Sequence, residues 1–433
     1  MNKNLTIITL LFTYLFRKII RISKKKKIVF LCSVLLPVSV FTQQIEVCKT
    51  CPIKTVKEAI QNAAPHSTIK LKDGIYKEYD ILIDKPVTIL GSRKAIIDGN
   101  NKGYILKIVA DSVTVKGITI KNVGRSYTSD YAAIYISKSK HFVLEEIKAE
   151  NVLFGFLIEK SKKGLVKNNH IFSNAVVEAG SGNGIHLWHS DSVIIENNEV
   201  HNLRDGIYFE FVTNSKVINN SSHHNLRYGL HFMFSNNDEY HNNEFRDNGS
   251  GVAVMFSKNI AMTKNKFIYN WGTASYGLLL KEIYDAEIID NTFQENTIGI
   301  NIEGSTRINY KKNNFISNGW AIKIAGACYA NKFNQNNFLH NSFDVSYNSK
   351  LNDNNFTNNY WSEYTGYDLD KNGVGDVPYR PVKLFSYIVN KTPETVVLLR
   401  SLFVDIINFS EKVSPAFTPD NLVDKQPLMR KIQ

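Results

Sequence analysis

The chain has 433 residues, of which 43% are hydrophobic and 21% are charged, a balance typical of a folded protein rather than a disordered one. The formal net charge of +12 would suit a partner such as nucleic acid, but residues 1–42 contribute eight basic residues and no acidic one. Removing those eight charges from +12 leaves +4, which argues against nucleic-acid binding.

Residues 1–42 have the order of an export signal. A basic run, Lys24–Lys27, precedes the apolar stretch Ile28–Phe41, and polar residues begin at Thr42. We expect a leader that is cleaved near Thr42, with an uncleaved anchor as the alternative. Either arrangement places the rest of the chain outside the cytoplasm.

Cys48 and Cys51 form a lone CxxC pair at the start of the mature chain. In an oxidising compartment we expect a disulfide between them. A metal site is the alternative, although no second pair of ligands accompanies the motif. No thioredoxin-like βαβ pattern surrounds it, so the pair does not predict a redox enzyme.

Glycine recurs at a nearly fixed spacing, each time at the start of a short apolar strand. The intervals are 22, 23, 22, 26 and 22 residues, between Gly184, Gly206, Gly229, Gly251, Gly277 and Gly299. A period of this size marks stacked repeats, in which no single unit can bury its apolar face alone.

A second pattern, Asn-x-Phe-x-x-Asn, follows the same period and predicts another strand in each coil. It begins at Asn243, Asn265, Asn291, Asn313, Asn336 and Asn354. Asparagine tolerates left-handed backbone and can hydrogen-bond along a stack, so we expect columns of asparagine at the turns between strands.

Side chains alternate after each repeat glycine. Residues one and three positions on are apolar, as in Ile185 and Leu187, whereas those two and four positions on are mixed. We therefore predict an all-β fold, a right-handed single-stranded parallel β-helix over residues 43–365. A helix over residues 55–64, with a capping box at Thr55 and Glu58, would cover its first coil.

Two further segments follow the solenoid. Residues 366–381 form an acidic glycine-bearing loop, and residues 382–433 form a tail. Apolar residues recur at three- and four-residue spacing over 396–409, which predicts an amphipathic helix. Such a helix would pack on the solenoid end, lie on a membrane or dock on a partner.

Several long strings outside the bare repeat carry a resemblance to a known family. They are GNGIHLW (182–188), DGIYFEFVTNS (205–215), NLRYGLHFMFS (225–235), SGVAVMFS (250–257), YNWGTASYGLLLK (269–281), residues 358–382 and the tail at 400–430. The chain resembles the NosD family of nitrous oxide reductase maturation proteins over essentially its whole mature length.

The resemblance implies a non-catalytic periplasmic subunit of an ABC transporter, joined through its C-terminal region to a membrane permease and a cytoplasmic ATPase. It also implies contact with a copper chaperone lipoprotein and with apo nitrous oxide reductase, during assembly of the copper–sulfur centre. The chain has no GxxxxGK[ST] loop of its own, so ATP hydrolysis would occur in the partner.

The outward positions of the central coils gather histidine and methionine. We expect one file of His186, Tyr208 and His231 beside a second of Glu210, Met233 and Met255. With rungs about 4.8 Å apart, His231, Met233 and Met255 could share one ion, and soft neutral ligands suit a transient Cu(I). The alternative is an exposed methionine surface that docks a partner. Three more histidines lie in the preceding turn region: His201, His223 and His224.

The acidic loop matches the first part of a calcium-binding pattern at Asp368, Asp370, Asn372 and Asp376. Tyr379 stands where the closing bidentate Glu would be. A structural calcium and a plain Asn/Gly turn that hydrogen-bonds itself both remain open.

Two other functions fit a β-helix. Polysaccharide lyases and epimerases need a base and a charge-neutralising group in a groove, but the central outward face offers Lys281 as its nearby cation and no such constellation. An adhesion-type repeat protein leaves the apolar tail unexplained.

Overall fold

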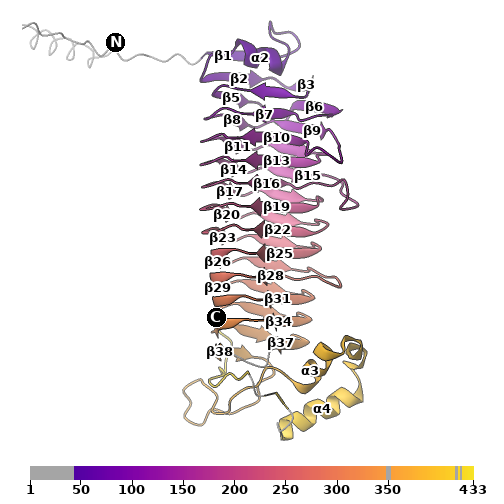
Figure 1. Ribbon diagram of the computed structural model, residues 1–433, viewed down its shortest axis with the longest axis vertical. Helices are drawn as coiled ribbons and strands as arrows, with labels where there is room; N and C mark the ends of the chain where they lie inside the picture. The colour runs from indigo at the N-terminus through magenta and orange to yellow at the C-terminus, as the bar shows by residue number, and fades with distance from the viewer. Residues whose placement is uncertain (1–42, 348–352, 415–417, 420–421) are drawn as a thin grey trace, which may run out of the picture. The chain divides into compact units, whose positions relative to one another are not determined.

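The computed structural model describes residues 43–347, 353–414, 418–419 and 422–433. The predicted leader, residues 1–42, lies outside these ranges. From Gln44 on, the chain passes repeatedly through three sheets whose strands all pair in parallel, each coil stacking on the one before it (Figure 1). The predicted parallel β-helix is confirmed.

We number the sheets 1 to 3. Sheet 1 has 14 strands, in the order β1 (Gln44–Val47), β2 (Ser67–Leu71), β5 (Val87–Leu90), β8 (Thr114–Lys116), β11 (Val143–Glu145), β14 (Leu165–Lys167), β17 (Ile194–Glu196), β20 (Lys216–Ile218), β23 (Glu239–His241), β26 (Lys258–Thr263), β29 (Tyr284–Ile289), β32 (Thr306–Lys311), β35 (Tyr329–Asn334) and β38 (Asp353–Thr357). Sheet 2 has 12 strands, β4 (Ile81–Ile83), β7 (Leu106–Ile108), β10 (Ala132–Ser137), β13 (Phe154–Glu159), β16 (Ile185–Trp188), β19 (Asp205–Glu210), β22 (Tyr228–Met233), β25 (Ser250–Met255), β28 (Leu278–Lys281), β31 (Ile298–Glu303), β34 (Trp320–Ala325) and β37 (Phe343–Tyr347). Sheet 3 has 13 strands, β3 (Gly74–Lys77), β6 (Ala95–Lys102), β9 (Thr119–Val123), β12 (Lys148–Glu150), β15 (His170–Phe172), β18 (Glu199–His201), β21 (Ser221–His223), β24 (Glu244–Arg246), β27 (Lys266–Ile268), β30 (Thr292–Gln294), β33 (Asn314–Ile316), β36 (Asn337–Leu339) and β39 (Tyr360–Trp361).

Each coil therefore carries three strands, whereas the sequence predicted two. The glycine pattern marks the strand of sheet 2, and the Asn-Phe pattern marks the strand of sheet 3. The strand of sheet 1 lies between them, as β20 does between β19 and β21. Its three residues have a single inward side chain, Val217, which is too short an alternation to stand out in the sequence.

The repeat glycines of sheet 2 lie where neighbouring coils approach closely, a position that alanine fills at Ala133 and Ala321. A Cβ added to Gly206 would lie 2.6 Å from the carbonyl oxygen of Gly229 in the next coil, and one added to Gly251 would lie 2.4 Å from that of Gly277. A backbone oxygen cannot move aside as a flexible side chain can. A very small residue is therefore favoured at this position, and it recurs once in each coil.

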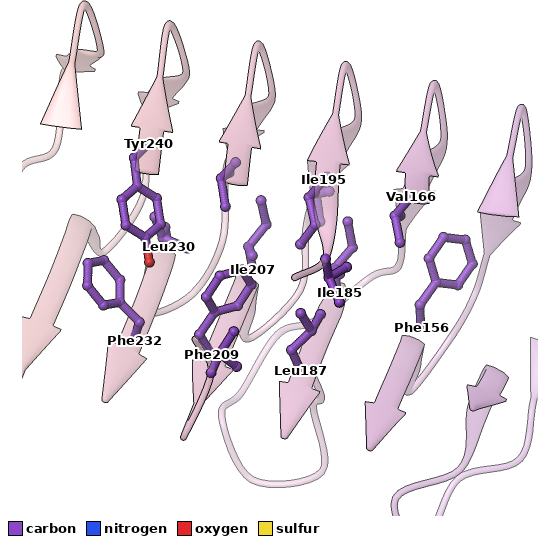
Figure 2. Close-up of a cluster of buried hydrophobic side chains, with 14 of the residues drawn as sticks. Phe156, Val166, Ile185, Leu187, Ile195, Ile207, Phe209, Leu230, Phe232 and Tyr240 are labelled. Carbon is purple, nitrogen blue, oxygen red and sulfur yellow. The ribbon is translucent and has the colours of Figure 1, made fainter. Parts of the chain in front are cut away.

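The core runs through the middle of the stack. The inward residues that the sequence predicted, such as Ile207 and Phe209, are fully buried, and Figure 2 shows them meeting Leu230 and Tyr240 between the sheets. On sheet 3 the inward aromatic rings stack at 4.0–5.6 Å between centroids, along Phe245, Phe267, Phe293, Phe315, Phe338 and Trp361. Each buried ring of this size contributes roughly 1.5–3 kcal/mol.

The predicted asparagine columns are present. In the main one each side chain donates from Nδ2 to Oδ1 of the next at 2.9–3.0 Å, along Asn169, Asn198, Asn220, Asn243, Asn265, Asn291, Asn313, Asn336 and Asn359. The left-handed conformation belongs to the residue before each ladder asparagine, as at Asn219 (φ 55°) and Asn242 (φ 53°). Asparagine thus fills two adjacent roles in one turn.

One assignment from the Asn-Phe pattern is wrong. Asn354 and Phe356 do not continue the column of sheet 3; they lie at the end of sheet 1, where Phe356 stacks on Phe333 at 4.2 Å. Asn359 continues the column, followed by Trp361. Both sheets carry an aromatic residue two positions after an asparagine here, so the pattern alone cannot separate them.

The N-terminal cap is confirmed. Helix α2 (Val56–Asn62) begins at Thr55, whose hydroxyl accepts from the Glu58 amide at 3.2 Å. Glu58 returns its carboxylate to the amide of Lys54 instead of Thr55, so the capping box is only half formed. Cys48 and Cys51 form a disulfide, which is the first of the two alternatives for that pair.

The tail folds back onto the last coils. It contains α3 (Leu384–Lys391), the 3₁₀ helix η1 (Pro393–Leu398) and α4 (Leu402–Val413) in place of one continuous helix over 396–409. Ser401 breaks the run because its side chain caps α4 through the amide of Val404. Inner apolar residues of the helices pack against the starts of the last sheet 2 strands, in a cluster of Ile298, Trp320, Phe343, Phe385, Val389 and Val404.

Other apolar residues of α4 face solvent. Leu402 is 74% exposed and Phe409 is 68% exposed, so the helix buries one face and leaves an apolar face uncovered. Within the described residues, no helix combines the length and apolar character needed to cross a bilayer. The chain beyond α4 returns to the solenoid, where Asp424 and Leu428 bridge to Phe356 and Tyr360.

Candidate functional site

The pairing register confirms the two predicted files on sheet 2. His186, Tyr208 and His231 are Cα partners on β16, β19 and β22. In the neighbouring file, Glu210 is the partner of Met233, and Met233 is the partner of Met255 on β25. The 22-residue repeat therefore brings side chains from four coils onto one face.

This face is less exposed than the sequence predicted. The alternation placed His231 on an outward position, but the side chain is only 6% exposed. Its ring lies 4.8 Å from the ring of Tyr208 and 4.8 Å from that of Tyr228, and these two large rings cover it. Met233 and Met255 are half-buried, so the methionine pair forms a partly covered surface.

His231 has polar neighbours but no hydrogen bond. Its Nδ1 lies 3.8 Å from Oδ2 of the fully buried Asp205, beyond hydrogen-bond reach, and neither ring nitrogen has a partner. Asp205 is held instead by Arg227, at 2.9 Å from Nε and 2.5 Å from Nη2. Burial alone would raise the pKa of Asp205, but the Arg227 hydrogen bonds and charge hold it below its ordinary value.

Sequence reasoning missed Asp205, Arg227 and Tyr228. Asp205 comes directly before the repeat glycine Gly206, a position that other coils fill with Asn183, Tyr228 or Ser250. The sequence did carry a signal for Asp205: it is a charged residue at a position where the other coils have an uncharged one. A buried carboxylate requires a partner, so a nearby basic residue could have been expected.

His186 presents a neutral imidazole. Burial, followed by the charge of Arg204, lowers its pKa to about 3. Its Nε2 has no hydrogen-bond partner and its Nδ1 lies 3.5 Å from Nδ2 of Asn183. The unprotonated form is the one that can donate a lone pair to a metal.

Tyr208 links the two files. Burial, followed by the nearby Glu210 charge, raises its pKa to about 12, so the phenol keeps its proton. The hydroxyl points to Sδ of Met233 at 4.0 Å, a weak contact that orients the thioether. The face can thus offer imidazole nitrogen and thioether sulfur together, the ligands of a soft metal ion.

A second set of ligands lies on sheet 3. Among the described residues, His170, Glu199 and His201 form a group whose potential ligand atoms lie within 4.8 Å of one another. The sequence pointed to His201 and His223 as neighbours one coil apart, and their registers confirm this. It missed His170 and Glu199, because a long loop separates β15 from β16 and interrupts the period between His170 and His201.

The acidic loop hydrogen-bonds itself. Asp368 accepts from the amides of Asn372 and Gly373 at 3.1 and 2.9 Å, and Asp376 accepts from the amide of Leu369 at 2.7 Å. Asp370 accepts from both the amide and Nδ2 of Asn372. This geometry supports the plain turn, and calcium binding here stays a prediction.

The fold and this face define a class: a parallel β-helix protein that gathers histidine and methionine side chains on one sheet. Residues 173–366 match the family model described as periplasmic copper-binding protein (NosD), and this range contains every candidate residue of sheet 2. This part of the chain is therefore similar to the NosD family, and the relatives below extend the similarity over most of the chain.

Two curated relatives carry the name probable ABC transporter binding protein NosD. The one from Pseudomonas aeruginosa is 28% identical over 370 residues, covering 81% of this chain and 86% of the relative. The one from Stutzerimonas stutzeri is 26% identical over 368 residues, covering 80% and 84%.

Solved structures of similar fold include the A-module of mannuronan C-5 epimerase AlgE6 from Azotobacter vinelandii. It has a TM-score of 0.61 and 12% identity, covering 72% of this chain and 96% of that one. The surface adhesin PfbA of Streptococcus pneumoniae has a TM-score of 0.54 and 15% identity, covering 67% and 86%. At these identities the likeness shows the fold alone.

Proposed function

We propose that this protein is a periplasmic accessory subunit of an ABC transporter that assists assembly of the copper–sulfur centre of nitrous oxide reductase. In this proposal the sheet 2 face, which we define as His186, Glu210, His231, Met233 and Met255, accepts Cu(I) from a chaperone lipoprotein and passes it on. The family name and the names of the relatives support an association with copper and with a transporter.

The observation that carries the proposal is the buried imidazole of His231, whose Nδ1 faces the Asp205 carboxylate at 3.8 Å and whose Nε2 has no hydrogen-bond partner. A buried polar group without a hydrogen bond costs about 1–3 kcal/mol, and Nε2 of this ring has none. The ring lies between two tyrosines, in the same strand as Met233. A metal ion would use the lone pair that the protein leaves unsatisfied.

The ligand chemistry favours Cu(I) as a transient cargo. Thioether sulfur and imidazole nitrogen are the ligands of a soft monovalent ion, and Glu210 beside Met233 adds one carboxylate to this face. The partial exposure of Met233 and Met255 leaves a side from which a second protein can supply or remove ligands. Met-rich surfaces also adapt to partners, so ion transfer and docking would use the same face.

We propose that the uncovered face of α4 docks on the membrane permease and touches the inner membrane. We define this face as Leu402, Phe403, Ile406, Phe409 and Val413, which are 55–74% exposed. The opposite side of the helix packs on the end of the solenoid through Val404. A partner bound to the exposed side of α4 would therefore be linked to the sheet 2 face through the packing of α4 on the last strands of sheet 2.

A carbohydrate epimerase or lyase is the alternative that the fold permits. Sheet 2 offers Lys281 beyond Met255, and Arg204 and Arg227 lie near His186 and His231. The Arg227 guanidinium is already paired with the buried Asp205, which leaves it less available to neutralise a substrate carboxylate. We therefore assign no catalytic residue. Formation of unsaturated products or of epimerised residues from alginate would favour the alternative.

The proposal is tested by reductase maturation in a denitrifying cell that lacks its own copy of this gene. Supplying the His231→Ala/Met233→Leu/Met255→Leu variant should yield reductase deficient in its copper–sulfur centre, whereas the wild type restores it. A His241→Ala variant, altered at an exposed histidine of sheet 1, is the matched control. Full maturation with the triple variant would contradict a role for this face.

A further inference from the structure

We propose that sheet 3 carries a separate binding site for a divalent transition-metal ion, formed by His170, Glu199, His201 and His223. This site goes beyond the copper-transfer function and uses none of its residues. Its ligands come from three successive strands, β15, β18 and β21, so a bound ion would join three coils across the outer surface of the solenoid.

The nitrogens and oxygens already lie at ligand spacing. Nε2 of His170 and Nε2 of His201 share a hydrogen bond at 3.0 Å. An ion bound at about 2.0–2.1 Å by both imidazoles would replace the shared proton with little change in this separation. Glu199 lies between the outer histidines, with Oε2 at 3.7 Å from His170 Nε2 and Oε1 at 3.4 Å from His223 Nε2. One carboxylate can therefore serve either side of the ion.

Ring stacking fixes the orientation of these imidazoles. The His201 ring is parallel to that of Phe172 at 5.1 Å and to that of His223 at 4.8 Å. His170 in turn packs on Phe172 at 4.7 Å. The strand register holds these rings close together, but the lone pairs of the parallel His201 and His223 rings lie in separate planes. One of these two rings must turn out of the stack before both can bind the same ion.

His223 has a further contact of the kind that orients metal ligands. Its Nδ1 lies 2.8 Å from Nδ1 of the adjacent His224, which leaves Nε2 directed to Glu199. A partner on the second ring nitrogen fixes the tautomer of a ligating histidine. His224 is thus a positioning residue in this proposal.

The charges around the cluster permit a cation. Glu199 places one negative charge between His170 and His223, at 3.7 and 3.4 Å from their Nε2 atoms. Of the basic residues that act on these histidines, Lys148 is paired with Glu150 at 2.6 Å and Arg246 with Glu244 and Asp247, while Arg93 also acts on His170.

Imidazole nitrogen with one carboxylate is the donor set of borderline divalent ions such as Zn²⁺ and Cu²⁺. The sheet 2 face adds two thioethers, those of Met233 and Met255, which favour soft monovalent copper. The two sites therefore differ in ligand class as well as in sheet, and Zn²⁺ is the probe that separates them.

The test is a calorimetric titration of metal-free wild-type protein with Zn²⁺ alone. We expect one tight site, and binding at least about 100-fold weaker in His170→Ala/His201→Ala, since loss of supporting residues alone costs about 10–100-fold. The Glu199→Gln variant, which keeps the shape, should bind with intermediate affinity. His241→Ala, an exposed histidine of sheet 1, should bind like the wild type.

Two further arms keep this proposal distinct from copper transfer. The His231/Met233/Met255 triple variant should keep its Zn²⁺ site, and substitution with Co²⁺ should give visible absorption bands in the wild type that the His170/His201 variant lacks. Circular dichroism checks that each variant is folded. Absence of Zn²⁺ binding in the wild type, or equal binding in the folded double variant, would overturn the site.

Discussion

Asp238 places a carboxyl group at an inward position of the turn before β23. Its Oδ1 accepts from the amide of Ser215 at 2.8 Å, but the buried Oδ2 has no partner. Burial raises the pKa of Asp238 to about 8. In later coils Asn331 and Asn354 accept from the coil before and donate back to it, so an amide fits this kind of position.

We predict that Asp238→Asn becomes more stable than the wild type as the pH rises. The folded-state pKa of about 8 lies above the ordinary 3.8, so the folded protein holds this proton more tightly and loses stability between those two values. The variant should have a melting temperature near that of the wild type at pH 4 and a higher one at pH 8. The rise at pH 8 corresponds to a gain of about 1–3 kcal/mol in the free energy of unfolding. Thermal melts at both pH values measure this; an equal difference at both would contradict it.

The candidate copper residues show what a sequence can place and what it cannot. The 22-residue period and the alternation of side chains fix which residues share a face, so the two files could be predicted. The burial of His231 depends on the rings of Tyr208 and Tyr228, and the Asp205–Arg227 pair depends on rotamers of two coils. Neither the burial of His231 nor the Asp205–Arg227 pair produces a repeating pattern in the sequence.

At the scale of elements, the asparagine column ends on an acidic residue from the tail. Oδ2 of Asp424 accepts from the amide and Nδ2 of Asn359 at 3.1 Å, and from Nε1 of Trp361 at 3.1 Å. The last coil of a solenoid would otherwise leave these donors without partners. Asp424 thus closes the column and fastens the C-terminal segment.

We predict that Asp424→Ala frees the C-terminal segment and lowers stability by at least about 3 kcal/mol, because three buried donors lose their acceptor. Asp424→Asn keeps one acceptor oxygen and should lie between the two. Melting temperature and limited proteolysis beyond residue 418 measure the effect. A wild-type melting temperature in the alanine variant would show that the cap contributes nothing.

The closing role of Asp424 could not be predicted, since it joins residues 65 positions apart without a repeat to relate them. The N-terminal cap is different because its signal is local. Thr55 and Glu58 are three residues apart, and helix α2 begins where they predict.

At the scale of the whole molecule, the fold followed from periodicity alone, while the tail needed three-dimensional packing. The apolar spacing over 396–409 predicted amphipathic character, and α4 has it. Which apolar residues would be covered was decided by the end of sheet 2, where Trp320 and Phe343 meet Phe385 and Val404.

We predict that Phe403→Ser/Phe409→Ser leaves the solenoid intact but weakens co-purification with the permease. Both side chains are more than half exposed, so their loss removes little internal packing and mainly reduces the apolar docking area. Val176→Ser/Val177→Ser, exposed at 82% and 62% on the loop after β15, is the matched control. Unchanged co-purification of the phenylalanine variant would place the permease contact elsewhere.

The central claim is that the sheet 2 face binds Cu(I), and a competition titration against a chromogenic Cu(I) chelator under anaerobic, reducing conditions tests it most directly. The wild type should take up Cu(I) with near-unit stoichiometry, and His231→Ala/Met233→Leu/Met255→Leu should lose it, while His170→Ala/His201→Ala should retain it. No uptake by the wild type, or equal uptake by the triple variant, would contradict the claim and leave this face as a docking surface.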